Sequence, residues 1–225
     1  MAMIGWRTGV LVPTVSLLLL GCAPNPQHLT SHYLDQFAES NPTPASFREC
    51  HGFGCAEKSL VSLDKHQWRR VAAVFSPPPK NAQDERHRIA KAIALMQHLV
   101  GAQTGTSVHQ WTHKDRRILP NFGDPSQLDC IDEAVNTWTY LTMMERSGLF
   151  RFHHVANLAY AGLPNDTDPR NAAVVQERDG SHFAVDPSLV DAGVPPPIIP
   201  LEKWLGKWPP ELALEHKAGS THSHT

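Results

Sequence analysis

The hydrophobic pattern of this chain changes its period once, and that change constrains the fold more than any other feature. Residues 82–105 carry apolar side chains at helical spacing, with charged residues on the opposite face. A second helical pattern ends at Gly148. Beyond it the chain shows the short alternating or apolar runs that are typical of strands, at 150–162, 171–180 and 181–189. Two helices followed by an antiparallel meander predict an α+β fold.

Both predicted helices carry end signals. Asn81 or Asp84 is placed to cap the first helix, and the sequence GAQTG is placed to end it. The second helix is expected to begin near Ser126 or Asp129, since either side chain can accept a hydrogen bond from the amides of a first turn. The sequence SQLD at 126–129 further indicates a capping box between these two residues.

The first 21 residues are typical of an export signal. Arg7 precedes an apolar run that ends in LLGC, and the run is too short to span a membrane. This end resembles the lipobox of bacterial lipoproteins, and the resemblance implies cleavage before Cys22, which would then carry the lipid. An ordinary signal peptide cut nearby, with Cys22 left plain, is the alternative. The expected location is the bacterial cell envelope, with the membrane bound through the lipid anchor.

The rest of the chain is expected to form one domain. Residues 22–48 are rich in Pro, Asn, Ser and Gln and predict a tether. Residues 49–212 are assigned to a single domain, which is long enough to bury a core, and 213–225 to a disordered tail. The formal net charge of −2 argues against a nucleic-acid partner.

The four cysteines fall into three groups. Cys22 is assigned to the lipid, and Cys50 and Cys55 lie in the tight loop ECHGFGCAE. Because an exported chain meets oxidising conditions, this pair predicts a small disulfide loop. A metal knuckle that includes His51 is the competing interpretation, but it lacks a second pair of ligands. No metal or other cofactor is therefore predicted, and Cys130 is left without a cysteine partner.

Cys130 is expected in the first turn of the second helix. The positive end of the helix dipole favours a thiolate there, which is the nucleophilic form. The neighbouring Asp129 and Asp132 act in the opposite direction, because like charge raises the pKa of a thiol. A cysteine hydrolase also needs a base within hydrogen-bond reach and a third group that orients the base.

Residues 85–205 resemble the transglutaminase-like branch of the papain-type superfamily. Asp129, Cys130, Asp132 and Ala134 match its DC-x-D/E-x-A type motif, and "VD" at 185–186 matches the end of its last strand. The resemblance implies a helix with an N-terminal cysteine packed on an antiparallel meander. It also implies hydrolysis of peptide or amide bonds without a cofactor, with Cys130 as the nucleophile and Asp186 as the orienting carboxylate.

The sequence departs from this family at the histidine. If Gln176 faces Ser181 across the hairpin, Asn171 faces Asp186, and the histidine position falls on Arg170 or Asn171. Arg170 stays charged and has no lone pair to accept a proton, and Asn171 cannot take one at a useful pH. The base position therefore lacks an imidazole in this sequence.

Other histidines are fallback candidates for the base. His182 shares a strand face with Asp186 but lies roughly 13 Å away along the strand. His109 and His113 could fold over Cys130 from the preceding loop. They could also form a metal pair if that loop were helical, although no third ligand is evident.

Three hypotheses of function remain open. The first is a lipid-anchored envelope protein with a catalytically degenerate transglutaminase-like fold. The second is an active cysteine peptidase or amidase that acts on envelope peptides with a base from elsewhere. The third is a non-enzymatic adaptor for envelope peptides or proteins, which exposed side chains of Trp204 and Trp208 would favour.

Overall fold

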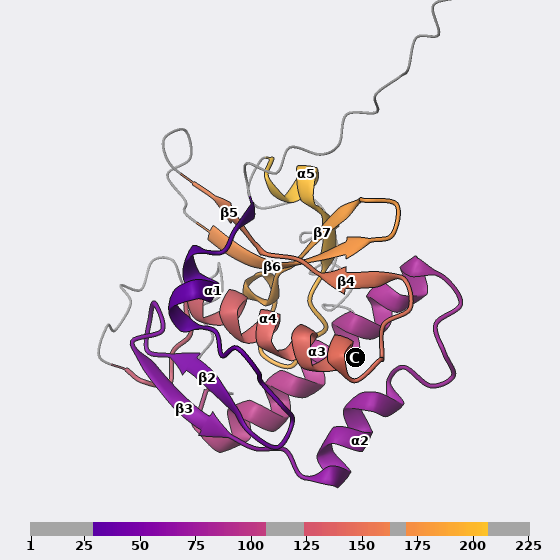
Figure 1. Ribbon diagram of the computed structural model, residues 1–225. Helices are drawn as coiled ribbons and strands as arrows, with labels where there is room; N and C mark the ends of the chain where they lie inside the picture. The colour runs from indigo at the N-terminus through magenta and orange to yellow at the C-terminus, as the bar shows by residue number, and fades with distance from the viewer. Residues whose placement is uncertain (1–28, 107–123, 163–169, 207–225) are drawn as a thin grey trace, which may run out of the picture.

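The computed structural model describes residues 29–106, 124–162 and 170–206, and it confirms the α+β class. Two long helices lie against one face of an antiparallel sheet (Figure 1). The elements, in chain order, are β1 (Leu29–Thr30), α1 (His32–Phe37), β2 (Phe47–His51), β3 (Glu57–Val61), α2 (Lys65–Ala73), α3 (Ala82–Thr104), α4 (Cys130–Arg146), β4 (His153–Val155), β5 (Leu158–Ala161), β6 (Arg170–Glu177), β7 (His182–Val185), a 3-10 turn (Pro187–Leu189), β8 (Ile198–Pro200) and α5 (Leu201–Trp204).

The main sheet has the order β1-β5-β6-β7-β8. β4 also pairs with β6, along the stretch of β6 that follows the one paired with β5. The hairpin of β6 and β7 pairs Gln176 with His182, so the predicted pairing of Gln176 with Ser181 is wrong by one residue. The reason lies in the turn, where Gly180 has φ +92° and Glu177 N–H donates to the Ser181 carbonyl at 2.8 Å. This turn adds one residue to the β7 side, as a bulge does.

The two long helices begin and end at the local signals that the sequence carries. Asn81 caps α3 by accepting from Asp84 N–H, and Gly105 ends it with φ +79°. Asp129 caps α4 and forms a capping box with Asp132. The predicted box between Ser126 and Asp129 is therefore wrong, and the true box lies three residues later.

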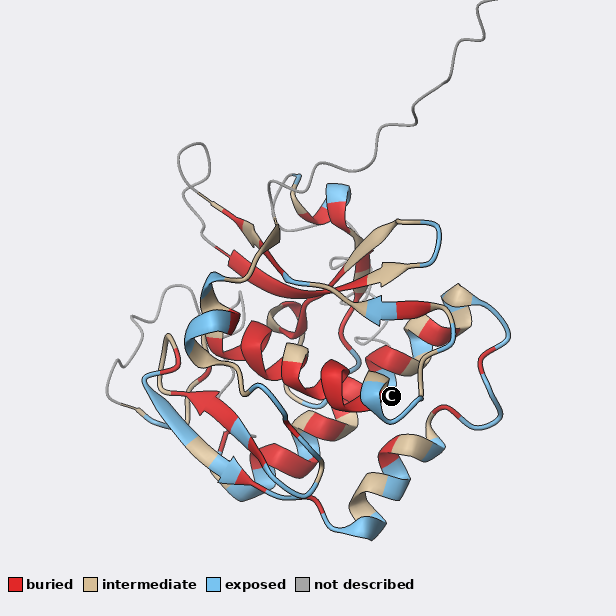
Figure 2. Cartoon of the chain, viewed as in Figure 1, coloured by how far each residue is buried: buried red, intermediate tan, exposed pale blue. Residues whose placement is uncertain are grey.

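The core fills both faces of the sheet. Alternate residues of β6 point to opposite sides, so that Ala173 and Val175 join the core under α3 and α4, and Ala172 and Val174 join a second core under α5. Figure 2 shows α4 buried along most of its length. That burial places the first turn of α4, with Cys130, directly against β6.

The domain begins earlier than the sequence predicted. Residues 29–48 were assigned to the tether, but β1 pairs with β5, and Leu34 and Phe47 belong to the main core. The apolar residues of this segment are few, and their partners are distant in sequence, so its composition resembled a linker. Within the described residues, no helix is long and apolar enough to cross a membrane.

Candidate functional site at Cys130

The first turn of α4 is held by a small disulfide loop. Cys50 and Cys55 form the predicted disulfide. His51 does not form the alternative metal knuckle, because its Nδ1 lies 2.8 Å from the Pro125 carbonyl and its Nε2 lies 2.9 Å from Ser59 Oγ. Among the described residues, no group of three or more His, Cys, Asp or Glu side chains could hold a metal ion.

The loop binds α4 through its backbone amides. Residues 52–55 all have positive φ, between 57° and 80°, so that successive N–H groups converge on one side as an anion-binding nest. Phe53 and Cys55 donate to the Asp132 carboxylate at 3.0 and 2.7 Å, and Gly54 donates to Asp129 at 3.0 Å. The acidic residues beside Cys130 therefore dock the helix on this loop.

Cys130 itself is half-buried, and its thiol is poorly suited to ionise. Burial, together with the charge of Asp129, raises the pKa of Cys130 to about 12, although the hydrogen bonds from Asn171 act in the opposite direction. The helix N-terminus by itself favours a thiolate and acts against burial and the charge of Asp129.

Asn171 occupies the place beside the thiol where a hydrolase needs an imidazole. Its Nδ2 lies 3.6 Å from Cys130 Sγ and donates to it. Its Oδ1 is buried and has no hydrogen-bond partner in the described part of the chain. Of the two residues predicted at the histidine position, Asn171 is thus the one that reaches the thiol, although it does not face Asp186 as predicted, because of the changed register.

Arg170 points to the other face of the sheet. Its guanidinium donates to the carbonyls of Trp204 and Gly206, both at 3.2 Å, and lies 5.3 Å from the Trp204 ring centroid. Adjacent residues of a strand point to opposite faces, so Arg170 and Asn171 cannot both reach Cys130.

Asp186 is buried at the end of β7 and binds groups other than a histidine. It accepts from Trp204 Nε1 at 2.8 Å and from Ser188 N–H and Oγ at 3.1 and 2.6 Å. Burial raises the pKa of Asp186, and the bonds from Ser188 and Trp204 partly offset that effect. Trp204 is fully buried, so the exposed surface that would favour an adaptor is not formed by this residue, and Trp208 lies outside the described residues.

The fallback histidine of β7 lies far from the thiol. His182 pairs with Gln176, five residues along β6 from Asn171, which corresponds to roughly 17 Å. The fallback assignment of His182 as the base is therefore incompatible with this geometry. His153 is buried at the same distant end of the sheet, and His109 and His113 lie outside the described residues.

Three further polar residues around the thiol were not singled out from the sequence as site residues. Burial raises the pKa of Tyr33, and the nearby thiol of Cys130 and phenol of Tyr160 add to it. Tyr160 pairs with Asn171 across β5 and β6, a neighbour that strand counting does find. Glu133 follows Cys130 by three residues on α4. Its Oε1 is buried without a hydrogen-bond partner among the described residues, and burial followed by the charge of Asp186 raises its pKa well above the ordinary value. No signal in the sequence links Tyr33 to this site.

Comparison with known proteins gives no relative. No family model matches the chain, and neither the curated proteins nor the solved structures contain a significant match. The chemistry of the site therefore rests on its own geometry: a protonated thiol, an amide that donates to it, and phenols and carboxyls nearby. Such a set can bind a polar group, and it contains no imidazole that is hydrogen-bonded to the thiol.

Proposed function

We propose that this is a lipid-anchored cell-envelope protein built on a transglutaminase-like scaffold whose thiol site binds rather than hydrolyses. One observation carries the proposal, namely the 3.6 Å contact in which Asn171 Nδ2 donates to Cys130 Sγ. An amide can orient a bound group, but it cannot remove the thiol proton and return it to a leaving amine, as a cysteine hydrolase requires.

The electrostatics of the site support the same proposal. With the pKa of Cys130 at about 12, the thiolate fraction at pH 7 is on the order of 10⁻⁵. The half-buried thiol, the Asn171 amide and the Tyr33 phenol suit hydrogen bonds with a peptide group. The signal and LLGC at the N-terminus place the expected ligands among envelope peptides or proteins.

The test measures alkylation of Cys130 by iodoacetamide in the native chain between pH 6 and pH 10. We expect negligible labelling below pH 8 and rapid labelling on denaturation, with Cys130→Ala as the blank. Asn171→His should raise the native rate at pH 7 by about 100-fold, because an imidazole beside the thiol favours the thiolate. Asn171→Gln, which keeps the amide, is the matched control and should not raise it.

The opposite result would favour the active peptidase or amidase. Rapid labelling of the unaltered chain near pH 6 would contradict the proposal. If His109→Ala or His113→Ala then abolished that labelling, a base from outside the described residues would be established, and hydrolysis of envelope peptides would become the function to assay.

A further inference from the structure

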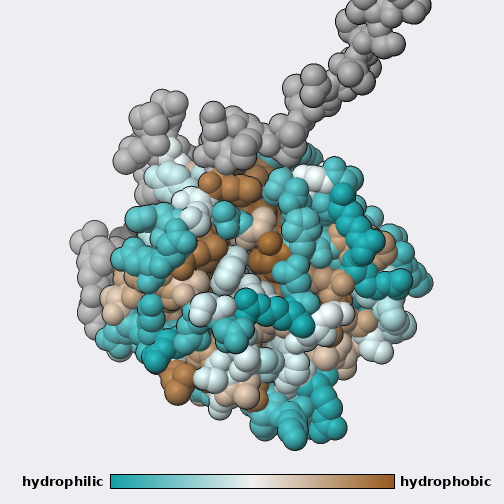
Figure 3. Space-filling view, viewed as in Figure 1, coloured by the Kyte–Doolittle hydropathy of each residue, from teal (hydrophilic) through white to brown (hydrophobic). Residues whose placement is uncertain are grey.

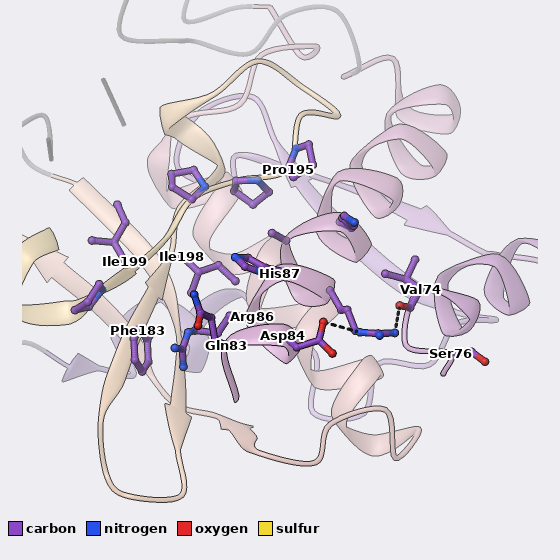
Figure 4. Close-up of a pocket in the computed structure, with 16 residues that line it drawn as sticks. Val74, Ser76, Gln83, Asp84, Arg86, His87, Phe183, Pro195, Ile198 and Ile199 are labelled. Carbon is purple, nitrogen blue, oxygen red and sulfur yellow. Dashed lines mark hydrogen bonds and ion pairs between the residues drawn. The ribbon is translucent and has the colours of Figure 1, made fainter. Parts of the chain in front are cut away.

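A groove that the thiol site does not use lies at the β8 edge of the sheet. It is a cavity of about 1080 Å³ between α3, the segment after α2, and residues 195–200. Figure 4 shows Gln83, Arg86 and His87 projecting from α3 toward the chain that carries Ile198, with Phe183 beside them. The volume is at the upper end of the range for small-molecule pockets and suits a short polymer.

One wall of the groove is apolar and carries few backbone donors. Residues 195–200 read PPPIIP, and Phe183 lies beside them, whereas Val74 lines the groove from the segment after α2. β8 is the last strand of the main sheet, but proline has no N–H, so four of the six residues cannot donate to an added strand. A ligand at this edge must therefore be held by side-chain contacts instead of β-augmentation.

The opposite wall is polar and carries the basic side chains of α3. Gln83, His87 and Lys91 follow one another at intervals of four residues on α3, so they form one stripe along the groove. Asp84 is the only acidic residue in the described lining, and Arg88 binds it at 3.3 Å. Lys91 makes no ion pair with any described residue, which leaves its charge available to a ligand.

Arg86 fixes the end of the groove. Its Nη1 lies 2.6 Å from Glu177 Oε2 and 3.2 Å from His153 Nε2, and its guanidinium stacks 4.0 Å from the Phe183 ring centroid. These contacts hold a rigid apolar and cationic surface next to the prolines, so little side-chain entropy is lost when a ligand binds there.

We propose that this groove binds an extended peptide that alternates acidic and apolar side chains. Six extended residues span roughly 18 Å and the α3 stripe spans roughly 12 Å, so about four peptide residues fit between the two walls. An anionic membrane surface is disfavoured as the occupant, because recognition of a lipid surface uses clusters of four to eight exposed cations. The described lining of the groove has three, and two of them, Arg86 and Arg88, already bind carboxylates.

The test measures fluorescence anisotropy of a fluorescein-labelled hexapeptide of alternating glutamate and leucine, titrated with the full-length chain at 50 mM salt. We expect saturable binding in the micromolar range that Lys91→Glu weakens at least tenfold. Lys65→Glu, the same charge reversal at the far end of α2, is the matched control and should change the affinity less than twofold. A peptide with lysine in place of glutamate should prefer the Lys91→Glu variant.

Three results would overturn the proposal. They are the absence of binding at millimolar peptide, equal binding by the Lys91→Glu variant, and equal binding of a peptide with glutamine in place of glutamate. Displacement of the peptide by vesicles of phosphatidylglycerol but not of phosphatidylcholine would instead assign the groove to an anionic membrane surface. Circular dichroism of both variants confirms that they fold, and Lys91 is exposed on the helix surface, so folding is expected to persist.

Discussion

Glu85 and Cys130 mark two polar sites at opposite ends of the sheet. The two sites differ in whether their buried polar atoms have hydrogen-bond partners. Glu85 accepts four hydrogen bonds, from the backbone N–H groups of Arg151, Phe152 and His153 and from His153 Nδ1, all between 2.6 and 3.0 Å. Around Cys130, buried oxygens of Asn171 and Glu133 have no partner among the described residues.

The two sites also differ in the direction in which the pKa values of their ionisable groups are shifted. Burial alone would raise the pKa of Glu85, but the hydrogen bonds from His153 and the backbone outweigh it and hold the pKa below the ordinary value. Burial raises the pKa of Cys130, Glu133 and Asp186. The first site stabilises the fold through a charge that donors surround, and the second keeps buried acceptor oxygens that no described donor satisfies, as ligand sites do.

His153 completes the satisfied site. Arg86 lies 3.2 Å from its Nε2, and because a guanidinium only donates, this nitrogen carries the lone pair. The ring proton is therefore on Nδ1, where it is donated to Glu85 at 2.9 Å. Although the pair of a histidine and a carboxylate resembles part of a catalytic triad, its other ring nitrogen is bound to Arg86, so its role is structural.

The largest expected effect comes from removing the charge at the satisfied site. Glu85→Gln replaces one acceptor oxygen by an NH₂ group that faces backbone donors, and we expect a loss of about 3–4 kcal/mol in the free energy of unfolding. Urea denaturation at pH 7 measures it. A loss below 1 kcal/mol would show that the four hydrogen bonds do not carry the stability that distinguishes this site.

The same substitution at Glu49 should have the opposite sign at alkaline pH. Burial raises the pKa of Glu49 to about 8, against an opposing hydrogen bond from Tyr140 Oη. A raised folded-state pKa gives stability that is present below the unfolded value near 4.5 and is lost as the pH rises through 8. Glu49→Gln mimics the protonated acid, so we expect it to be near neutral at pH 5 and stabilising, on the order of 3 kcal/mol, at pH 9.

Urea denaturation at both pH values tests this expectation. The unaltered chain should lose stability between pH 5 and pH 9, and Glu49→Gln should lose less. An equal slope for the two proteins would mean that Glu49 is charged in the folded state, and the contrast with Glu85 would disappear.

A smaller effect is expected from the loop that docks α4. Removing both cysteines, Cys50→Ala with Cys55→Ala, opens a short loop and should cost about 2 kcal/mol by the loop-entropy relation. The backbone nest that binds Asp129 and Asp132 should loosen as well. Hydrogen exchange of the amides of residues 53–55 and 131–132 should therefore accelerate in the double variant, while the amides of 151–153 at the Glu85 site should be unchanged.

The smallest effect is expected at the thiol itself. Cys130→Ala removes a half-buried sulfur whose neighbours already have unsatisfied oxygens, so we expect a change below about 1 kcal/mol in the free energy of unfolding. Thermal unfolding of this variant beside Glu85→Gln gives the direct comparison. A loss above 2 kcal/mol would identify Cys130 as a core residue and would weaken the proposal of a binding site.

The sequence predicted the features that depend on local chemistry. The capping residues Asn81 and Gly105 predicted the two ends of α3. The acidic residues before Cys130 predicted the start of α4 to within a few residues. The family resemblance and the counting of hairpin residues led to Arg170 or Asn171 as the residue beside the thiol, and Asn171 is the one that contacts it. Features that depend on distant partners were missed, and these include the β2–β3 hairpin, whose Phe47 is buried beside Tyr140 of α4, and the Glu85 network.

The predicted register of the β6–β7 hairpin was wrong for a related reason. A turn with φ +92° at Gly180 adds a residue that spacing alone does not reveal. The surface was also not predictable in detail: in Figure 3 hydrophobic residues form patches among hydrophilic ones, and the groove beside α3 depends on how residues 195–200 pack against it.

The alternation of β6 has a consequence for how such a site can change over time. Arg170 and Asn171 are neighbours on the strand but face opposite sides, so the register of β6 decides which of them meets the thiol. A slip of one residue would bring a guanidinium to Cys130 in place of an amide, and a nearby positive charge favours a thiolate. The chemistry of the site therefore depends on strand register as well as on residue identity. One insertion or deletion in a surface turn that shifts this register would place a guanidinium beside the thiol and favour the reactive thiolate.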